Sequence, residues 1–158
     1  MEKLSWLVIG LLALPGCYLG AGPAVGVSAK HKRRVIGWEA SAVAVGGLSG
    51  GQAFRRDPDG WKTASWGAFG VELPLIRNRD ALAAPLLRAQ IGGAEGDECG
   101  FVAGFGAGAI GHWNGICGDT EYVFDTTLTI RRIAGDTQLL LVPRIGFLGT
   151  PACKEEQP

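Results

Sequence analysis

The chain has 158 residues, enough for one domain with a real core, and its 15 basic and 15 acidic residues give a formal net charge of zero. This balance argues against partners that are recognised through a strong field, such as a nucleic acid or an acidic substrate. Glycine is abundant, at 26 residues, but the glycines have no collagen period and are interleaved with Val, Ala, Phe and Trp. This pattern indicates strands with small residues on a crowded face.

The first seventeen residues carry a targeting pattern. Glu2 and Lys3 precede an uncharged apolar run, Leu4 to Leu14, which fits the apolar core of about 7–15 residues found in secretory signals. The sequence Leu14-Pro15-Gly16-Cys17 follows. It resembles the type II signal peptide of bacterial lipoproteins, although Pro15 departs from the Ala, Ser, Thr or aliphatic residue usual there.

The resemblance implies removal of a signal peptide, residues 1–16, and lipidation of Cys17, for example with palmitate, as the mature N-terminus. Because Tyr18 rather than Asp follows the cysteine, lipoprotein sorting by resemblance favours the outer membrane of the bacterial cell envelope. The implied partner is therefore membrane lipid, reached through the acylated Cys17.

Two other interpretations of this stretch remain open, an ordinary cleaved signal and a retained transmembrane helix. No residue from Leu4 to Ala29 is charged, which exceeds the roughly 18 residues of a spanning helix. Helix breakers interrupt the run at Pro15, Gly16, Gly20, Gly22, Pro23 and Gly26. Because Pro costs about 3 kcal/mol and each Gly about 1 kcal/mol in a helix interior, we expect the helix to stop near Leu14.

After Tyr18 the hydrophobic pattern has a period of two, which predicts strands rather than amphipathic helices. The predicted strands are seven, at 22–29, 35–46, 61–74, 82–93, 99–113, 121–133 and 137–149. Most breaks between them are short and polar, and the exception is a longer connection at 47–60. Short connections join antiparallel neighbours, whereas parallel neighbours need long crossovers.

We therefore expect an all-β fold, an antiparallel up-and-down meander that closes into a small barrel of about eight strands and leaves few open edges. Residues 17–149 would form this single β-barrel domain, and residues 150–158 a polar C-terminal tail.

The alternation gives the strands an apolar face and a small or polar face. The apolar face carries Trp38, Ala40, Ala42, Ala44, Phe69, Val71, Leu73, Leu87, Ala89, Ile91, Phe101, Ala103, Phe105, Ala107, Phe124, Leu128, Ile130, Leu141, Ile145 and Phe147. The other face carries Gly37, Glu39, Ser41, Glu72, Arg88, Gln90, Gly100, Gly104, Gly106, Gly108, Asp125, Thr127, Thr129, Arg131 and Arg144.

Two observations favour a barrel with its small, polar face inside and an apolar outer band, as in membrane-spanning barrels. The glycines of 99–113 would weaken a water-facing strand, but they fit a narrow lumen where Cβ atoms would collide. The charged residues balance, as a buried polar network requires. This network would consist of Glu39, Glu72, Arg88, Asp125, Arg131 and Arg144.

Aromatic residues near strand ends would form the girdles of such a barrel: Trp61, Trp113, Tyr122 and Phe147. The pattern resembles small outer-membrane β-barrels, although a polar tail rather than a terminal aromatic residue ends this chain. A soluble periplasmic barrel or sandwich, with the apolar face inside, remains the alternative.

Seven strands conflict with the even number usual in bacterial spanning barrels. A hidden turn at Gly46–Gly51 could fold Gln52–Phe54 back as a short strand, or a turn at Gly106–Gly108 could split 99–113 into a hairpin. Which cysteines can form a disulfide depends on which of these turns is present. If 99–113 is one strand, Cys99 and Cys117 lie roughly 45 Å apart at about 3.3 Å per residue, and a disulfide Cys117–Cys153 is expected; a hairpin would instead allow Cys99–Cys117.

No residues with a catalytic or metal-binding pattern stand out. His112 with Cys99 and Cys117 lacks the close paired spacing of zinc ligands, and Glu39 with Glu72 is better explained as part of an internal ion-pair network than as an acid/base pair. We expect no cofactor, no metal and no enzymatic activity. The basic run Lys30–Arg34 is either a solvated turn or a contact with anionic lipid headgroups.

The function expected from these features is that of a non-enzymatic outer-membrane lipoprotein with a small membrane-associated β-barrel and a structural or scaffold role in the envelope. The alternative is a lipid-tethered periplasmic barrel that binds a small apolar ligand. The two differ in the orientation of Phe101, Phe105 and Phe124, which point outward in the first and inward in the second.

Overall fold

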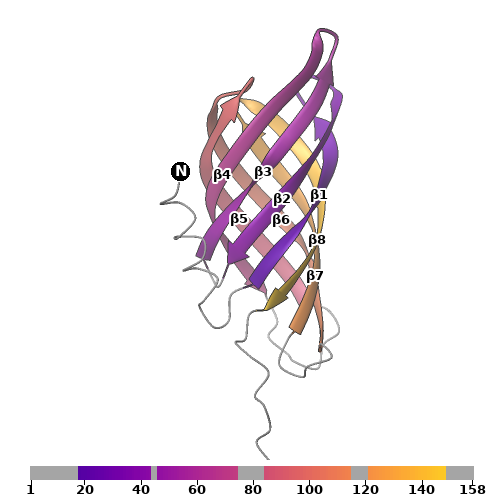
Figure 1. Cartoon of the computed structure of the whole chain (residues 1–158), viewed down its shortest axis with the longest axis vertical. Coiled ribbons are helices and arrows are strands. Elements are labelled where there is room, and N and C mark those ends of the chain that lie inside the picture. Colours follow the sequence, from indigo (N-terminus) through magenta and orange to yellow (C-terminus); the bar gives the residue numbers. More distant parts are fainter. Residues whose placement is uncertain (1–17, 44–45, 75–83, 115–120, 149–158) are drawn as a thin grey trace, which may run out of the picture.

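A computed structural model describes residues 18–43, 46–74, 84–114 and 121–148. In this part of the chain eight antiparallel strands follow one another in sequence order and close into a barrel (Figure 1). The strands are β1 (Tyr18–Ser28), β2 (Arg33–Val43), β3 (Gly46–Asp57), β4 (Gly60–Pro74), β5 (Ala84–Gly96), β6 (Gly100–Asn114), β7 (Glu121–Ile133) and β8 (Asp136–Leu148). The predicted all-β antiparallel meander is therefore confirmed.

The barrel closes where the first strand pairs with the last. β1 pairs with β8 in a register that runs from Tyr18 opposite Leu148 to Ser28 opposite Gln138. All the remaining strand pairs join strands that are neighbours along the chain. Closure leaves no free sheet edge, which is how barrels avoid edge-to-edge association. Among the described residues no helix is long and apolar enough to cross a bilayer.

The barrel has eight strands, in agreement with the expected number of about eight, and the strand missing from the seven predicted ranges is β3, most of which is formed by residues 47–60 that were expected as a loop. The glycines there do not make a turn. Gly47 and Gly51 face β2, where an added Cβ would collide with the backbone carbonyl oxygens of Ala42 and Trp38. These glycines therefore permit close strand pairing, and β3 runs extended along both β2 and β4.

The other candidate turn, at Gly106–Gly108, is also wrong. β6 continues without interruption from Gly100 to Asn114 and pairs along its length with β5 and β7. The eighth strand thus comes from β3 alone.

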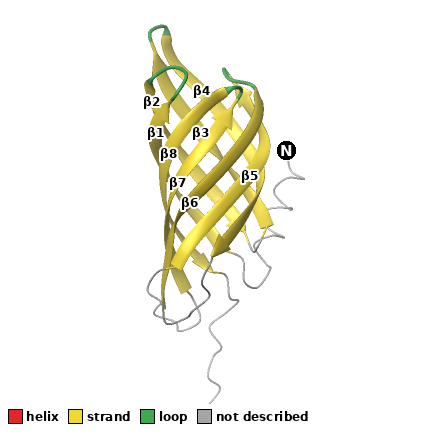
Figure 2. Cartoon of the chain, turned by 180° about the vertical axis from the view of Figure 1, so that it is seen from behind, coloured by secondary structure: helices red, strands yellow, loops and turns green. Residues whose placement is uncertain are grey.

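The two ends of the barrel differ. The turns that join β1 to β2, β3 to β4, β5 to β6 and β7 to β8 all lie at one end, which we call the hairpin end (Figure 2). Tyr18 and Leu148 lie at the opposite end, which we call the terminal end. The signal-peptide region and the polar tail 150–158 lie outside the described residues.

Alternation of burial along each strand places one set of side chains inside the barrel. On β8 the inward set begins with Asp136 and Gln138, continues with Leu140 and Val142, and reaches Arg144, each at most 2% exposed. Polar groups thus lie on both sides of an apolar layer.

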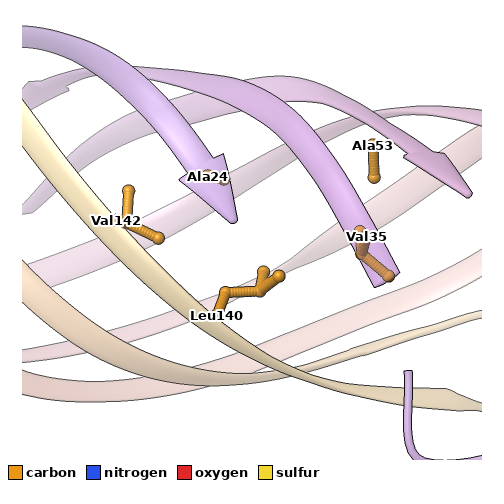
Figure 3. Close-up of a cluster of buried hydrophobic side chains, with 5 residues drawn as sticks. All are labelled: Ala24, Val35, Ala53, Leu140 and Val142. Carbon is orange, nitrogen blue, oxygen red and sulfur yellow. The ribbon is translucent and has the colours of Figure 1, made fainter. Parts of the chain in front are cut away.

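Two apolar clusters make up this layer. The first combines side chains from β1, β2, β3 and β8 (Figure 3): Ala24, Val35, Ala53, Leu140 and Val142. The second combines side chains from β4, β6 and β7: Ala64, Trp66, Ala68, Val102 and Ile133. The small residues in both clusters fit the narrow interior of an eight-stranded barrel.

Candidate functional site

The outer surface of the barrel is apolar almost everywhere. In the described part of the chain nineteen large hydrophobic side chains are exposed, and all of these belong to strands. They include the three rings that discriminate between the expected orientations: Phe101 is 57% exposed, Phe105 56% and Phe124 45%. The rings point outward, as the leading interpretation expects. A soluble monomer rarely exposes a contiguous apolar patch larger than a few hundred Å².

On the strands that the structure describes, charge on the outer surface is confined to the hairpin end. Among outward-facing strand residues whose side chains the structure describes, four are charged, and each stands one residue from the hairpin end of its strand: Arg34, Arg56, Glu95 and Arg132. The remaining outward positions carry no formal charge. The uncharged region forms a continuous band around the barrel, which we call the apolar band.

Aromatic side chains lie at both margins of the apolar band. Trp61, which is 57% exposed, lies at the hairpin end, whereas Tyr122 and Phe147 lie toward the terminal end; Trp38, which is 48% exposed, lies midway along β2. The side chain of Trp113 is outside the described part. Polar groups within the band contact one another: the Trp38 indole Nε1 donates to Gln52 at 3.3 Å, and the Gln52 amide donates to Ser65 at 3.2 Å.

Inside the barrel, Glu39 of β2 is the centre of an ionic network. Its carboxylate accepts hydrogen bonds from Arg88 of β5 through one oxygen and from Arg131 of β7 through the other. All three side chains are at most 1% exposed. The chain therefore joins three non-adjacent strands through one fully desolvated carboxylate.

Glu72 of β4 and Asp125 of β7 complete the network through Arg144 of β8. The Arg144 guanidinium contacts Glu72 Oε2 through Nη2 at 2.9 Å and Asp125 Oδ1 through Nε at 2.9 Å. Arg88 also contacts Glu72, with Nη2 2.6 Å from Oε1. The six residues of the sequence-predicted network are thus brought together, and their three acids and three arginines balance.

Neutral side chains make further hydrogen bonds with the charged groups of the network. Ser41 Oγ accepts from Arg144 at 2.6 Å, and the Tyr18 hydroxyl donates to Asp125. With its amide oxygen turned toward β7, Gln90 accepts from Arg131 Nε at 2.7 Å. The Arg131 guanidinium also lies 4.0 Å from the centre of the Trp66 ring, in cation–π geometry.

The inward glycines of β6 leave room for these long side chains. A Cβ on Gly104 would lie 2.7 Å from Gln90 Nε2, and one on Gly106 would lie 2.7 Å from Thr129 Oγ1. A Cβ on Gly108 would collide with the backbone carbonyl oxygen of Thr126. The prediction that these glycines face a crowded interior is confirmed.

A second charged cluster closes the interior at the hairpin end, around Arg55 of β3. Its guanidinium holds Asp57 through two hydrogen bonds of 2.8 and 2.9 Å, and it contacts Glu98 at 2.6 Å and Asp136 at 3.1 Å. Hydrogen bonding to Asp57 is the main influence that raises the pKa of Arg55, and the same contact lowers the pKa of the Asp57 carboxyl.

His31, Glu98 and Asp136 gather at this cluster, with potential metal-ligating atoms within 4.8 Å of one another. Arg55 occupies the position of a cation there, since it contacts both carboxylates. The cluster is therefore better described as an ion-paired cap on the interior than as a metal centre.

The described cysteine, Cys99, is a free and exposed thiol at the hairpin end. β6 runs unbroken from Gly100 at the hairpin end to Asn114 at the terminal end, which is the case in which the alternative disulfide Cys99–Cys117 is not expected. Cys17, Cys117 and Cys153 lie outside the described residues, so their lipidation and pairing stay predictions.

Several members of the interior network were not predicted from the sequence. Tyr18 precedes the first predicted strand, and Trp66 resembles the other surface-directed aromatic residues until strand phase is known. Arg55 was assigned to a loop. Tyr18 and Arg55 would have been found by extending the period-two alternation through residues 18–21 and 47–60, where glycines obscured it, and Trp66 by its phase with Glu72 on the predicted strand 61–74.

Comparisons with protein-family models, with curated proteins and with solved structures found no match to this chain. The function proposed below rests on the geometry of the barrel.

Proposed function

We propose that this protein is a non-enzymatic lipoprotein of the bacterial outer membrane whose barrel spans the bilayer and serves a structural or scaffold role in the envelope. The apolar band that encircles a charged interior is the observation that carries the proposal. It is the inverse of the arrangement in a soluble barrel and the arrangement of a spanning one.

The dimensions of the band agree with this role. On β8 the large outward side chains run from Leu139 to Phe147, and on β7 from Tyr122 to Ile130. A transmembrane strand needs about 9–11 tilted residues, so these stretches are long enough to cross. Aromatic side chains at the two margins suit the membrane–water interfaces.

The interior supports a sealed barrel rather than a channel. Arg88, Arg131 and Arg144 are among the largest fully buried side chains, together with Leu86, Ile133 and Leu140. Side chains with so little exposed surface leave no water-sized space beside them. A transport role would need such a space, which is why a structural role is preferred.

The lipid anchor fits the same orientation. Cys17 directly precedes Tyr18, the first residue of β1, and no linker separates them. An acylated Cys17 would therefore hold the terminal end at the periplasmic leaflet, and the hairpin end would reach the outer leaflet.

The alternative, a periplasmic module that binds an apolar ligand, expects aromatic rings around an enclosed cavity. Phe101, Phe105 and Phe124 instead lie on the outside, and the interior positions are occupied by charged pairs. Neither observation favours an apolar ligand inside the barrel.

The test separates the lipid from the barrel as the source of membrane attachment. Cys17→Ser and, as a matched control, Cys99→Ser would be expressed with radiolabelled palmitate, and membranes would be washed with alkaline carbonate. We expect the Cys17→Ser chain to lose the label and stay in the membrane pellet, whereas Cys99→Ser keeps both. Release of Cys17→Ser as a folded soluble protein would overturn the spanning barrel, and label retained on Cys17→Ser would overturn the lipid anchor.

A further inference from the structure

A basic groove opens at the hairpin end between the β1–β2 turn and the β3–β4 hairpin. Its volume is about 550 Å³, and it is lined by Lys32, Arg33, Arg34, Arg56, Asp57 and Pro58. Four of these six residues are cationic. The two strands that carry Arg34 and Arg56 are paired, with Val35 opposite Arg55, so the two arginines occupy facing positions on the outer surface.

The acid in the groove does not neutralise these cations. Both Asp57 carboxylate oxygens accept hydrogen bonds from Arg55, which points into the barrel. No ion pair involves Lys32, Arg33, Arg34 or Arg56 among the residues that the structure describes. Two arginines side by side repel each other, so this arrangement is unfavourable unless an anion lies between them.

The groove also borders the apolar band. Directly below Arg34 and Arg56, the next outward positions are Ile36 and Phe54, which face each other across β2 and β3. Val27 lies beside Arg34 on β1, and Trp61 lies beside Arg56 on β4. Unpaired cations thus stand immediately above exposed apolar and aromatic side chains, in the order in which a lipid presents its headgroup and acyl chains.

Elsewhere around the hairpin end the charge is different. The end of β5 carries Glu95, and the β5–β6 connection carries Asp97, which accepts a hydrogen bond from the Thr63 backbone N–H, and Glu98, which pairs with Arg55. The basic character is therefore local to β1–β3 and does not belong to the rim as a whole. A local cluster indicates recognition of a discrete anion rather than attraction to any negative surface.

We propose that this groove binds the phosphate-bearing headgroup of an anionic lipid in the leaflet at the hairpin end, with Arg34 and Arg56 as the principal contacts and Lys32 and Arg33 as supporting charges. The guanidinium fork suits phosphate because it can donate two parallel hydrogen bonds. The acyl chains would lie against Ile36, Phe54 and Val27. This inference rests on the proposed spanning barrel, since only an inserted barrel holds the groove at headgroup level.

The test measures lipid preference in the full-length protein inserted into phosphatidylcholine nanodiscs that contain a minor fraction of phosphatidic acid. Either the phosphatidic acid or an equal fraction of phosphatidylcholine carries brominated acyl chains, which quench nearby tryptophans, and Trp61, which is opposite Arg56 on β4, lies close enough to the groove to report. We expect the wild type to be quenched more by brominated phosphatidic acid than by brominated phosphatidylcholine.

Three variants test whether the lipid preference depends on the arginines of the groove. Arg34→Gln/Arg56→Gln should weaken the relative association of phosphatidic acid by about 5-fold per arginine, because a basic residue near an anionic surface is worth about that factor. Arg34→Lys/Arg56→Lys should keep most of the preference. Arg132→Gln, which removes a lone outward arginine of β7 at the same end, should change it little. Gel mobility with and without heating would verify that each variant remains folded.

The outcomes are distinct. Insertion with equal quenching by both lipids, or an effect of Arg132→Gln as large as the effect per arginine of Arg34→Gln/Arg56→Gln, overturns the groove and leaves the spanning barrel standing. Failure of the wild type to insert overturns both. If inorganic phosphate binds the detergent-solubilised protein in an Arg34- and Arg56-dependent way while no lipid preference exists, the groove is a site for a soluble anion and the lipid assignment is wrong.

Discussion

The two faces of β7 show how differently one strand can be built for two surroundings. Its inward positions carry Asp125, Thr127, Thr129 and Arg131, all at most 1% exposed, whereas its outward positions carry mainly large apolar side chains such as Phe124, Leu128 and Ile130. In a water-soluble barrel these two sets would be exchanged. Burial within the protein and preference for water are therefore separate properties. The polar side chains of β7 can be buried because they are paired. Its apolar side chains can be exposed because the proposed surroundings are lipid.

The largest loss of stability is expected from breaking the ion pairs inside the barrel. Glu39→Gln removes one of the three negative charges of the six-residue network and leaves Arg131 and Arg88 without their shared counter-ion. An uncompensated buried charge costs about 3–5 kcal/mol, so the free energy of unfolding should fall by that amount. Denaturant unfolding in lipid vesicles, followed by tryptophan fluorescence, measures it.

Glu95→Gln is the matched control, because it makes the same chemical change on the exposed outer surface and should stay within about 0.5 kcal/mol of wild type. Restoring neutrality with Glu39→Gln/Arg131→Gln should recover part of the lost stability, which is what charge balance predicts. Equal losses for the single and double variants would mean that the network stabilises through shape and not through charge.

The next largest loss of stability is expected from a charge placed on the outer face of the barrel. Leu128→Arg places a charge near the middle of the apolar band, where it should destabilise the inserted barrel by about 2–4 kcal/mol. Thr137→Arg, an outward substitution close to the hairpin end, should cost about 0–1 kcal/mol because the penalty declines toward the interface. The same vesicle unfolding assay compares the two, and a harmless Leu128→Arg would show that the band does not face lipid.

The smallest expected change in stability comes from alanine substitutions at two glycines on opposite faces of the sheet. Gly108→Ala puts a Cβ against the carbonyl oxygen of Thr126, and such overpacking should cost about 1–3 kcal/mol. Gly67→Ala is outward and meets nothing within 4 Å, so it should be neutral or stabilise by about 0.5–1 kcal/mol, since alanine loses less backbone entropy on folding. If both substitutions were equally costly, crowding of the interior would not explain the inward glycines.

Much of this organisation could be predicted from residue patterns. Period-two alternation separated Phe101, Phe105 and Phe124 from Glu39, Arg88 and Arg131, and charge balance indicated which set lies inside. The prediction failed where glycine removed the contrast between faces. Four of the six residues in Gly46–Gly51 are glycines, so the stretch shows too little alternation to give a phase, and most of β3 was interpreted as a loop.

Pairing partners were beyond prediction for a different reason. Alternation assigns a residue to a face, but the contact between Glu39 and Arg131 depends on the stagger of strands around the closed barrel. That stagger is a property of all the strand pairs together. The basic groove depends on it as well, since Arg34 and Arg56 are 22 positions apart in the chain and meet only through the β2–β3 register.

The seam between β1 and β8 has a consequence for how the protein folds. Every other strand pair is formed by chain neighbours and can assemble locally, but this one joins Tyr18 to Leu148 and must wait until the last strand is available. Contacts with such large sequence separation are slow to form. Glu72 and Ser41 reach Arg144, and Tyr18 reaches Asp125, only when the seam is closed. We therefore expect the network to form in two stages: Glu72–Arg88 and Asp125–Arg144 join neighbouring strands and need no seam, whereas the contacts that reach across the seam are made last, as the barrel closes.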